Sequence, residues 1–318
     1  MKKAIEVSPL LGLCFGILAV STASIFIRFA QDQAHSLVIA AGRLSIATLL
    51  IAPFVLIRSW GEIKSIPRRT FGLLILAGLF LGLHFATWIT SLEFTSVASS
   101  VVLVATAPLW VALLSPVFLK EKINKIVFLG LFFSLVGSVI VGLNSACDFT
   151  AGTMACISFE SLFGGRSFIG NSLALAGALF SGGYLIIGRK VRSNLSLPVY
   201  TFLVYGFAAL VLIILMFLSG TSFTGYSPSS WIWIVLLAIV PQLLGHSTFN
   251  YFLKSLSAAF VSIALLGEPI GTVILAFLIL KESPSMLEIG GGLLILFGIF
   301  VASRVNYQKQ PKQESLPV

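Results

Sequence analysis

Ten apolar segments, each long enough to cross a lipid bilayer as a helix, follow one another along the 318-residue chain. An α-helix rises about 1.5 Å per residue, so about 20 apolar residues span the ~30 Å hydrocarbon core of a membrane. The connections are short except for residues 145–167. The sequence therefore predicts an all-α integral membrane protein with ten transmembrane helices. The expected helices cover residues 9–30, 36–57, 71–92, 97–119, 126–144, 168–188, 198–218, 230–252, 257–280 and 285–303.

Charged side chains are too scarce for a water-soluble protein. They make up 10% of the chain, against 58% hydrophobic residues, whereas soluble domains average about 25% charged residues. The net charge is +9, but no basic cluster is interleaved with aromatic residues in a polar segment, which argues against nucleic acid as a partner. Lys2 and Lys3 precede an apolar run that reaches Phe29 without a small-residue cleavage site. We interpret this run as the first spanning helix rather than a signal peptide.

Lysine and arginine positions indicate the orientation, because cytoplasmic loops carry an excess of both. With a cytoplasmic N-terminus, 16 of the 20 basic residues fall in inside segments, whereas the outside loops hold Arg166 and Lys281. Arg28 and Arg43 lie within or at the ends of helices. If the number of helices were wrong by one, every later connection would change sides and the excess of basic residues on one side would be lost. We therefore expect a plasma membrane of the bacterial inner-membrane type, with both termini in the cytoplasm.

The second half of the sequence partly repeats the first after a shift of 161 residues. The shift places Pro108 on Pro269 and the Leu-Lys-Glu triplet at 119–121 on the triplet at 280–282. Five helices is an odd number, so the second copy would enter the membrane the opposite way up, as in inverted-topology repeats of secondary transporters. The shift also carries Gly16, Arg28, Gly130 and Gly137 onto Gly177, Arg189, Gly291 and Gly298. The expected division is a first five-helix repeat at 9–143, an extracytoplasmic loop at 144–169, a second repeat at 170–303 and a cytoplasmic tail at 304–318.

Two of the three cysteines, Cys147 and Cys156, lie in the long outside loop, and the third is Cys14. In an oxidising compartment Cys147 and Cys156 could form a disulfide, or both could remain free thiols; the sequence leaves this open. No Cys-x-x-Cys motif and no Cys/His grouping with metal spacing occurs. We expect neither a metal site nor a cofactor.

Two prolines and one acid mark the middle of the predicted bundle. Pro108 and Pro269 sit near mid-membrane in segments four and nine. Proline removes a backbone hydrogen bond, and helix breaks at matching places in two halves are typical of a central binding site, although an ordinary kink is the alternative. Glu268 is the only acid deep in a spanning segment. Because a charge at the bilayer centre is costly, Glu268 is a candidate solute or proton site, or else a structural hydrogen-bonding residue at the break.

Two polar helix faces suggest the walls of a cavity. His84 and Trp88 are one helical turn apart on segment three, and Ser91 continues that face. His246 and Asn250 are one turn apart on segment eight. We expect these five side chains, with Glu268, to bind the solute; hydrogen bonding between helices is the alternative.

Arg43 lies about two turns inside segment two, where exposure to lipid would be unfavourable. Glu93, near the outer end of segment three, lies at a depth that would allow pairing. We expect a structural ion pair between Arg43 and Glu93.

These residues together resemble the EamA-type transporters of the drug/metabolite transporter superfamily, over nearly the whole chain. The likeness is specific for the family but does not separate its members. It implies ten helices, both termini in the cytoplasm and alternating access around a cavity lined by segments 1, 3, 4, 6, 8 and 9, with 5 and 10 at the periphery. Members similar to this chain move amino acids, other metabolites or S-adenosylmethionine. The features that carry the likeness are Gly42-Arg43, the run Ser91–Ala98 before Pro108, the stretch Leu265–Pro269 and the two Leu-Lys-Glu triplets.

The function that these features favour is secondary transport of a small metabolite, such as an amino acid or a related zwitterionic or aromatic solute. The solute would be coupled to protons or to a counter-solute. An exchanger for S-adenosylmethionine or a nucleoside-like metabolite is the alternative. The chain has no Gly-rich phosphate loop with Lys-Ser/Thr, which argues against ATP drive. It also lacks the His-Glu-x-x-His and Gly-x-Ser-x-Gly motifs of enzymes and any sequence typical of a channel selectivity filter.

Overall fold

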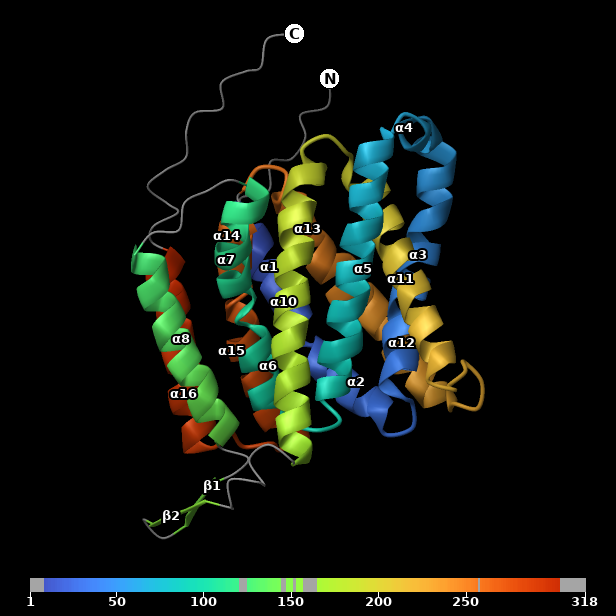
Figure 1. The fold of residues 1–318 in the computed structure, drawn as a ribbon. Helices are drawn as coiled ribbons and strands as arrows, with labels where there is room; N and C mark the ends of the chain where they lie inside the picture. Colours follow the sequence, from blue (N-terminus) through green and yellow to red (C-terminus); the bar gives the residue numbers. More distant parts are fainter. Residues whose placement is uncertain are drawn as a thin grey trace.

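Helices packed side by side form a single bundle in the computed structural model (Figure 1). The structure describes residues 9–119, 125–143, 147–150, 153–156, 165–256 and 258–303. Each of the ten apolar segments is helical within these ranges. Seven helical stretches of the described chain are long and apolar enough to cross a membrane, and three shorter apolar helical stretches accompany them.

The first half contains eight helices, which cover the first five apolar segments and one connection. The first segment is divided at Thr22, and the fourth is divided at Ala105 and Thr106. A short helix, α4, occupies the connection between the second and third segments. The bounds are α1 Pro9–Ser21, α2 Ala23–Gln31, α3 Ser36–Arg58, α4 Trp60–Lys64, α5 Arg68–Ser91, α6 Val97–Val104, α7 Ala107–Leu119 and α8 Lys125–Leu143.

The second half differs from the first in containing two π-helical stretches, η1 and η2. Stretches of this kind inside α-helices are rare and frequently occur at functional sites. The bounds are α10 Arg166–Arg192, α11 Leu197–Leu218, α12 Pro228–Leu237, η1 Ala238–His246, α13 Ser247–Phe252, α14 Ala258–Ala264, α15 Gly267–Leu275, η2 Ala276–Leu280 and α16 Met286–Ser303.

A small β-hairpin lies in the connection between the halves. Its strands, β1 Cys147–Thr150 and β2 Thr153–Cys156, pair in antiparallel register with Cys147 opposite Cys156. The sequence analysis did not expect strands in this loop. The hairpin projects from one end of the bundle and α4 lies at the other (Figure 1), and we call these the hairpin end and the α4 end.

Packing contacts recur after the shift of 161 residues. A Cβ added at Gly16 would lie 3.3 Å from Thr248 and 3.2 Å from Phe249, and one added at Gly177 would lie 3.2 Å from Thr87 and 3.3 Å from Trp88. The shift carries Gly16 onto Gly177, Thr87 onto Thr248 and Trp88 onto Phe249. Equivalent residues therefore make equivalent contacts between the halves.

The helices α8 and α16 are also related by this shift, and they pack directly against each other. A Cβ at Gly137 would lie 2.6 Å from the carbonyl oxygen of Gly291, and one at Gly298 would lie 2.5 Å from that of Gly130. Such close backbone approach is typical of small residues at helix interfaces in membranes. This pair lies to one side of the bundle (Figure 1), as the family resemblance implied for segments 5 and 10.

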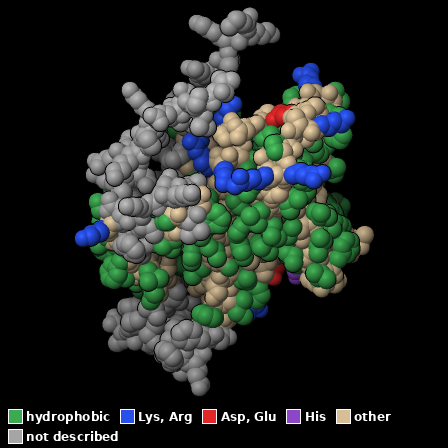
Figure 2. All heavy atoms as spheres, turned by 45° about the horizontal axis from the view of Figure 1, so that its top comes forward, with side chains coloured by type: hydrophobic (Ala, Val, Ile, Leu, Met, Phe, Trp, Pro, Cys, Tyr) green, Lys and Arg blue, Asp and Glu red, His purple; other side chains and the backbone are tan. Residues whose placement is uncertain are grey.

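The surface is apolar around the middle of the bundle and basic at the α4 end. Large exposed hydrophobic side chains occur on most of the long helices, for example Leu50, Phe132, Phe217 and Phe297. Figure 2 shows hydrophobic side chains covering much of the visible face, with lysine and arginine gathered toward the α4 end, which is turned forward. An apolar belt flanked by polar ends suits a lipid bilayer.

Candidate functional site

A cavity lies between helices of the two halves. Helices of five apolar segments line it: α5, α6 with α7, α10, η1, and α14 with α15. The resemblance also implied a contribution from the first segment, but no described residue of α1 or α2 lines the cavity. The lining residues are His84, Trp88, Val101, Val104, Ala105, Ala107, Pro108, Ser181, His246, Ser262, Leu265, Leu266, Glu268 and Pro269.

Two interrupted helices meet at this cavity. The helix α6 ends at Val104 and α7 begins at Ala107, so Pro108 is the second residue of α7. The helix α14 ends at Ala264 and α15 begins at Gly267, so Pro269 is its third residue. Proline is suited to the first turn of a helix, because the N–H it lacks would have no partner there. Each helix therefore restarts at its proline, beside the cavity.

Glu268 brings a carboxyl group to the wall at the second of these breaks. Its backbone N–H donates to the carbonyl oxygen of Leu265 at 3.0 Å. Its own carbonyl oxygen accepts a hydrogen bond from Ser21 Oγ at 3.4 Å. These backbone contacts hold the residue at the start of α15, where the side chain lines the cavity.

Two histidines and a tryptophan supply the polar and aromatic part of the wall. His84 Nδ1 lies 2.9 Å from the carbonyl oxygen of Gly177, and the His84 and Trp88 rings stack at 5.7 Å with 10° between their planes. The His246 ring meets Phe85 edge-to-face at 5.3 Å. The structure thus brings His84, Trp88 and His246 together with Glu268 around one cavity.

Ser91 and Asn250, which we expected to bind the solute, lie outside the cavity wall. Ser91 Oγ donates to the Trp88 carbonyl oxygen at 2.6 Å and lies 2.6 Å from Ser100 Oγ, so it ties α5 to α6. Asn250 accepts from the Tyr184 hydroxyl at 2.5 Å and donates to the Tyr205 hydroxyl at 3.2 Å. Both side chains are buried and engaged by neighbouring helices. This matches the alternative of hydrogen bonding between helices.

The expected ion pair between Arg43 and Glu93 is wrong. Arg43 Nε donates to Gln242 Oε1 at 2.9 Å. The Glu93 carboxylate instead accepts from the backbone N–H of Ser36 at 3.1 Å and from its hydroxyl, at the start of α3. The reason lies in the local structure, because a carboxylate can accept hydrogen bonds from the free N–H groups at a helix N-terminus. Glu93 therefore binds the start of α3 and is not directed toward Arg43.

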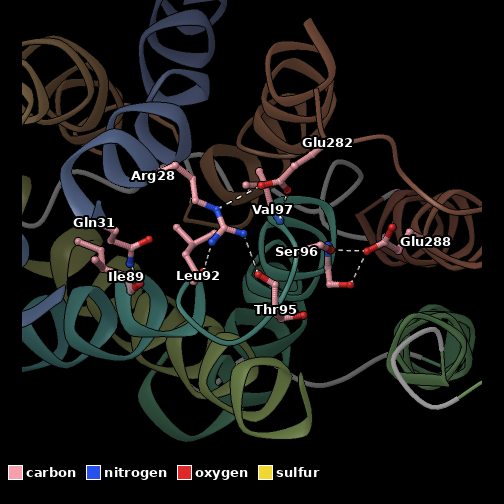
Figure 3. Close-up of polar contacts among 10 residues, drawn as sticks. Arg28, Gln31, Ile89, Leu92, Thr95, Ser96, Val97, Glu282 and Glu288 are labelled. Atoms are coloured by element: carbon pink, nitrogen blue, oxygen red, sulfur yellow. Dashed lines mark hydrogen bonds and ion pairs between the residues drawn. The ribbon is translucent and has the colours of Figure 1, made fainter. Parts of the chain in front are cut away.

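A polar network that was not predicted from the sequence joins the halves at the hairpin end (Figure 3). Arg28 Nε lies 3.4 Å from Glu282 Oε1, and the Arg28 guanidinium donates to the carbonyl oxygens of Leu92 and of Thr95, the latter at 3.0 Å. Glu282 Oε2 also accepts from the backbone N–H of Val97 at 3.1 Å. The repeated Arg28 and the repeated Leu-Lys-Glu triplet were the available signal.

Glu288 adds a second link at the same end. Its carboxylate accepts from the hydroxyls of Ser96 and Ser99, the latter at 2.7 Å, and from the backbone N–H of Ser285 at 2.8 Å. Figure 3 shows Glu282 and Glu288 reaching from the second half toward the turn before α6. The two halves are therefore tied at the hairpin end by two glutamates.

The cavity wall has the mixture of polar and apolar groups found in small-molecule sites. The cavity combines one carboxyl group, two imidazoles, two serines and an indole with apolar walls, as is typical of small-molecule sites. No group of three or more possible metal ligands occurs among the described residues. Such a wall can hold a small polar or aromatic solute.

Comparison with known proteins finds the same plan elsewhere. The model of the EamA-like transporter family matches residues 8–143 and 168–304. An uncharacterized transporter of Archaeoglobus fulgidus is 29% identical over 283 residues, which cover 89% of this chain and 92% of that protein. The uncharacterized transporter YyaM of Bacillus subtilis is 26% identical over 270 residues, 84% of each chain. A solved crystal structure with 18% identity covers 94% of the chain at a TM-score of 0.64 and shares its fold.

Proposed function

Because the chain belongs to the EamA-like transporter family, we propose that this multi-pass membrane protein is a secondary transporter that moves a small metabolite by alternating access. The observation that carries the proposal is the central cavity. Its wall is built from the interrupted helices of both halves, with Pro108 and Pro269 at matching positions. Discontinuous helices beside a midplane site are typical of secondary transporters.

We further propose that the two halves form five-helix repeats of opposite orientation, which gives ten spanning helices. The recurring contacts of Arg28 and Arg189 support this. Arg28 donates to the carbonyl oxygen of Leu92 at the hairpin end, and Arg189 donates to that of Leu253 at 2.7 Å. The shift of 161 residues relates both the donors and the acceptors, yet Arg189 lies at the end of α10 that faces α4 (Figure 1).

The orientation that we propose has the α4 end, both termini included, in the cytoplasm of a bacterial-type cell. The basic residues of the described connections favour it. The α4 end carries Arg58, Lys64, Arg68, Arg69, Lys125, Arg189, Lys190, Arg192 and Lys254, whereas the hairpin end carries Arg28, Arg166 and Lys281. Cytoplasmic connections are enriched in lysine and arginine.

The solute class that the cavity wall favours is a zwitterionic or aromatic metabolite, such as an amino acid. The Glu268 carboxyl group suits an ammonium group, and the stacked rings of His84 and Trp88 suit a planar or apolar side chain. An exchanger for S-adenosylmethionine or a nucleoside-like metabolite is the second candidate, because the same rings would stack on a purine.

The test is flux through the purified protein in proteoliposomes, after a thermal-shift screen with amino acids, nucleosides and S-adenosylmethionine selects the solutes. We expect saturable uptake that accelerates when unlabelled solute is present on the opposite side. An imposed pH gradient distinguishes proton coupling from solute exchange. Flux that rises linearly with concentration and shows no counterflow would indicate a channel and contradict alternating access, and product formation without a gradient would indicate an enzyme.

A further inference from the structure

Arg43 is a fully buried arginine whose terminal N–H groups have no acceptor in the described part of the chain. The side chain is 0% exposed, and its only hydrogen bond there joins Nε to Gln242 Oε1 at 2.9 Å. The guanidinium carbon lies 4.2 Å from the centre of the Phe85 ring. Among the residues that the structure describes, neither Nη1 nor Nη2 has a hydrogen-bond partner. Burying such donors without an acceptor is unfavourable, and far more so when they carry a charge.

Two other buried or half-buried arginines show how the fold normally satisfies this side chain. Arg28 donates to two carbonyl oxygens and pairs with Glu282. Arg192 donates to the carbonyl oxygens of Asn250, at 2.9 Å, and of Leu195. At both positions helix-terminal carbonyl oxygens are within reach, whereas Arg43 lies inside α3, where backbone carbonyls are already used by the helix.

Packing alone does not require a charge at this position. The shift of 161 residues carries Arg43 onto Val204 and Leu81 onto Gln242. Val204 and Leu81 are both buried and apolar. The symmetry-related pair, one residue in each half, is therefore aliphatic, so packing at this place does not by itself need the polar pair of Arg43 and Gln242.

The pair lies one aromatic ring away from the cavity. Phe85 has the Arg43 guanidinium over its face and the His246 ring against it at 5.3 Å, and His246 lines the cavity. Gln242 and His246 both belong to the π-helical stretch η1. Phe85 therefore lies between the guanidinium and a residue of the cavity wall.

We propose that Arg43, held by Gln242, is the subsite for a carboxylate group of the transported solute, reached when Phe85 moves aside. This inference rests on the proposed transport function and narrows the solute to a carboxylate-bearing one. The two free Nη groups form a planar fork that matches the two oxygens of a carboxylate. Glu268 provides a group of opposite charge for an ammonium group, so that the two residues together would recognise the two ends of an amino acid.

The test compares amino acids with their carboxamides, which keep the ammonium group and the side chain but lose the negative charge. Binding to the purified protein is measured with phenylalanine, histidine and methionine and their amides, by thermal shift and by competition for flux in proteoliposomes. We expect the wild-type protein to prefer at least one acid over its amide by about tenfold or more, the difference made by a charge-assisted hydrogen-bond pair. Arg43→Gln should abolish this preference while leaving amide binding unchanged.

Two further variants separate recognition from folding. Arg43→Lys keeps the charge but not the planar fork, so it should retain only part of the preference. Arg58→Gln removes an exposed arginine from the same helix and should change nothing. A melting temperature near that of wild type for Arg43→Gln shows that the helix packing is intact.

The outcomes distinguish this inference from the transport proposal. Flux of solutes with equal preference for acid and amide would overturn the carboxylate subsite and leave transport standing. Loss of acid and amide binding together in a well-folded Arg43→Gln variant would also overturn it. A chloride-dependent thermal shift that Arg43→Gln removes, without discrimination between acid and amide, would assign an inorganic anion instead. Absence of flux for every solute would contradict the transport proposal itself.

Discussion

The two halves of the molecule match where helices pack and differ where the cavity is polar. Gly16 and Gly177 make equivalent contacts, and Pro108 and Pro269 start equivalent helices. At the cavity wall, in contrast, the shift of 161 residues pairs Glu268 with Ala107, His84 with Gly245 and His246 with Phe85. The residues shared by the two repeats therefore determine the packing of the helices, whereas residues present in only one half supply the polar groups of the cavity wall.

This division has a physical reason. Close helix packing needs small residues and a defined backbone approach, and both halves need it equally. A small solute with unlike ends has no twofold symmetry, so a site that recognises it gains from unlike walls. This division would be wrong if a packing position mattered for stability in one half only, or if the loss of a polar side chain from the cavity wall had no effect on flux.

The largest effect, a loss of folded protein, is expected at the helix interface where the two halves match most closely. Gly137→Ala and Gly298→Ala would each place a methyl group within 2.6 Å of a backbone oxygen on the facing helix. Neither backbone can move freely in a packed interface, so each change should destabilise the protein by about 1–3 kcal/mol. The double variant should yield little folded protein, measured as the monodisperse fraction after extraction in detergent.

Gly290→Ala is the matched control, because Gly290 is an exposed glycine of α16 with nothing within 4 Å of an added Cβ. It should leave the melting temperature unchanged. Unequal losses for Gly137→Ala and Gly298→Ala would show that the halves do not pack equivalently at this interface.

The next largest effect, a loss of solute affinity, is expected at the cavity wall, where the two halves differ most. Glu268→Gln removes the carboxylate from the cavity wall and keeps the shape of the side chain. Losing one charge-assisted hydrogen bond, about 1.5–3 kcal/mol, lowers solute affinity by roughly 10- to 100-fold. Flux at several imposed pH gradients measures it, and loss of the response to the gradient would assign proton coupling to Glu268.

Ala107→Ser, the equivalent position in the first half, is the control and should have little effect on flux. Wild-type flux and an unchanged pH response in Glu268→Gln would remove Glu268 from both roles. The difference between Glu268 in one half and Ala107 in the other would then have no role in solute binding or in proton coupling.

The sequence predicted the helices and their packing well, but it predicted the polar residues of the cavity wall only in part. Hydrophobic length, the proline pair and the repeated glycines report helices and their contacts directly. Polar side chains one helical turn apart and a single deep acid indicated His84, Trp88, His246 and Glu268, which the structure gathers at one cavity. The apolar features led to helices at every expected segment. The reason is that burial of apolar length is a local property, visible in one segment at a time.

The residues that were predicted wrongly are those whose position depends on the rotation of a helix about its axis, or on a contact with a residue far away in the sequence. Asn250 follows His246 by one turn, but the π-helical stretch η1 ends at His246, and the altered turn shifts the faces on either side of it. Arg43 meets Gln242 across 199 positions of sequence. Neither the helix rotation nor the long-range partner could be derived from spacing alone.

A smaller effect, on the balance between the two conformations of the transporter, is expected at the equivalent residues Arg28 and Arg189. Arg28 joins Glu282 of the other half, and both side chains are partly exposed, at 25% and 34%. An exposed pair contributes about 0.2–1 kcal/mol, so Arg28→Gln should shift the balance between conformations by only about 1.5- to 5-fold. A cysteine introduced at Ser181, in the cavity wall, should then react faster with a membrane-impermeant thiol reagent added from the hairpin side.

The charge-swapped variant Arg28→Glu/Glu282→Arg keeps the ion pair but sets a carboxylate beside the carbonyl oxygens of Leu92 and Thr95, so it should only partly slow the thiol reaction again. Arg189→Gln, which removes the equivalent contacts to Leu253 and Lys254, should instead favour access from the α4 side. Equal acceleration from both sides in either variant would mean that these arginines stabilise the bundle in general and do not bias it toward one opening.

The smallest effect is expected in the connection between the halves, which has no counterpart within either repeat. Its hairpin register sets Cys147 opposite Cys156, and in an oxidising compartment such a pair is expected to form a disulfide. Protein purified without reductant and then denatured should therefore show one reactive thiol, from the exposed Cys14, and three after reduction. The double variant Cys147→Ser/Cys156→Ser should keep wild-type flux and melting temperature. If it lost either, the connection would contribute to the working structure, and the two halves would not account for the transporter by themselves.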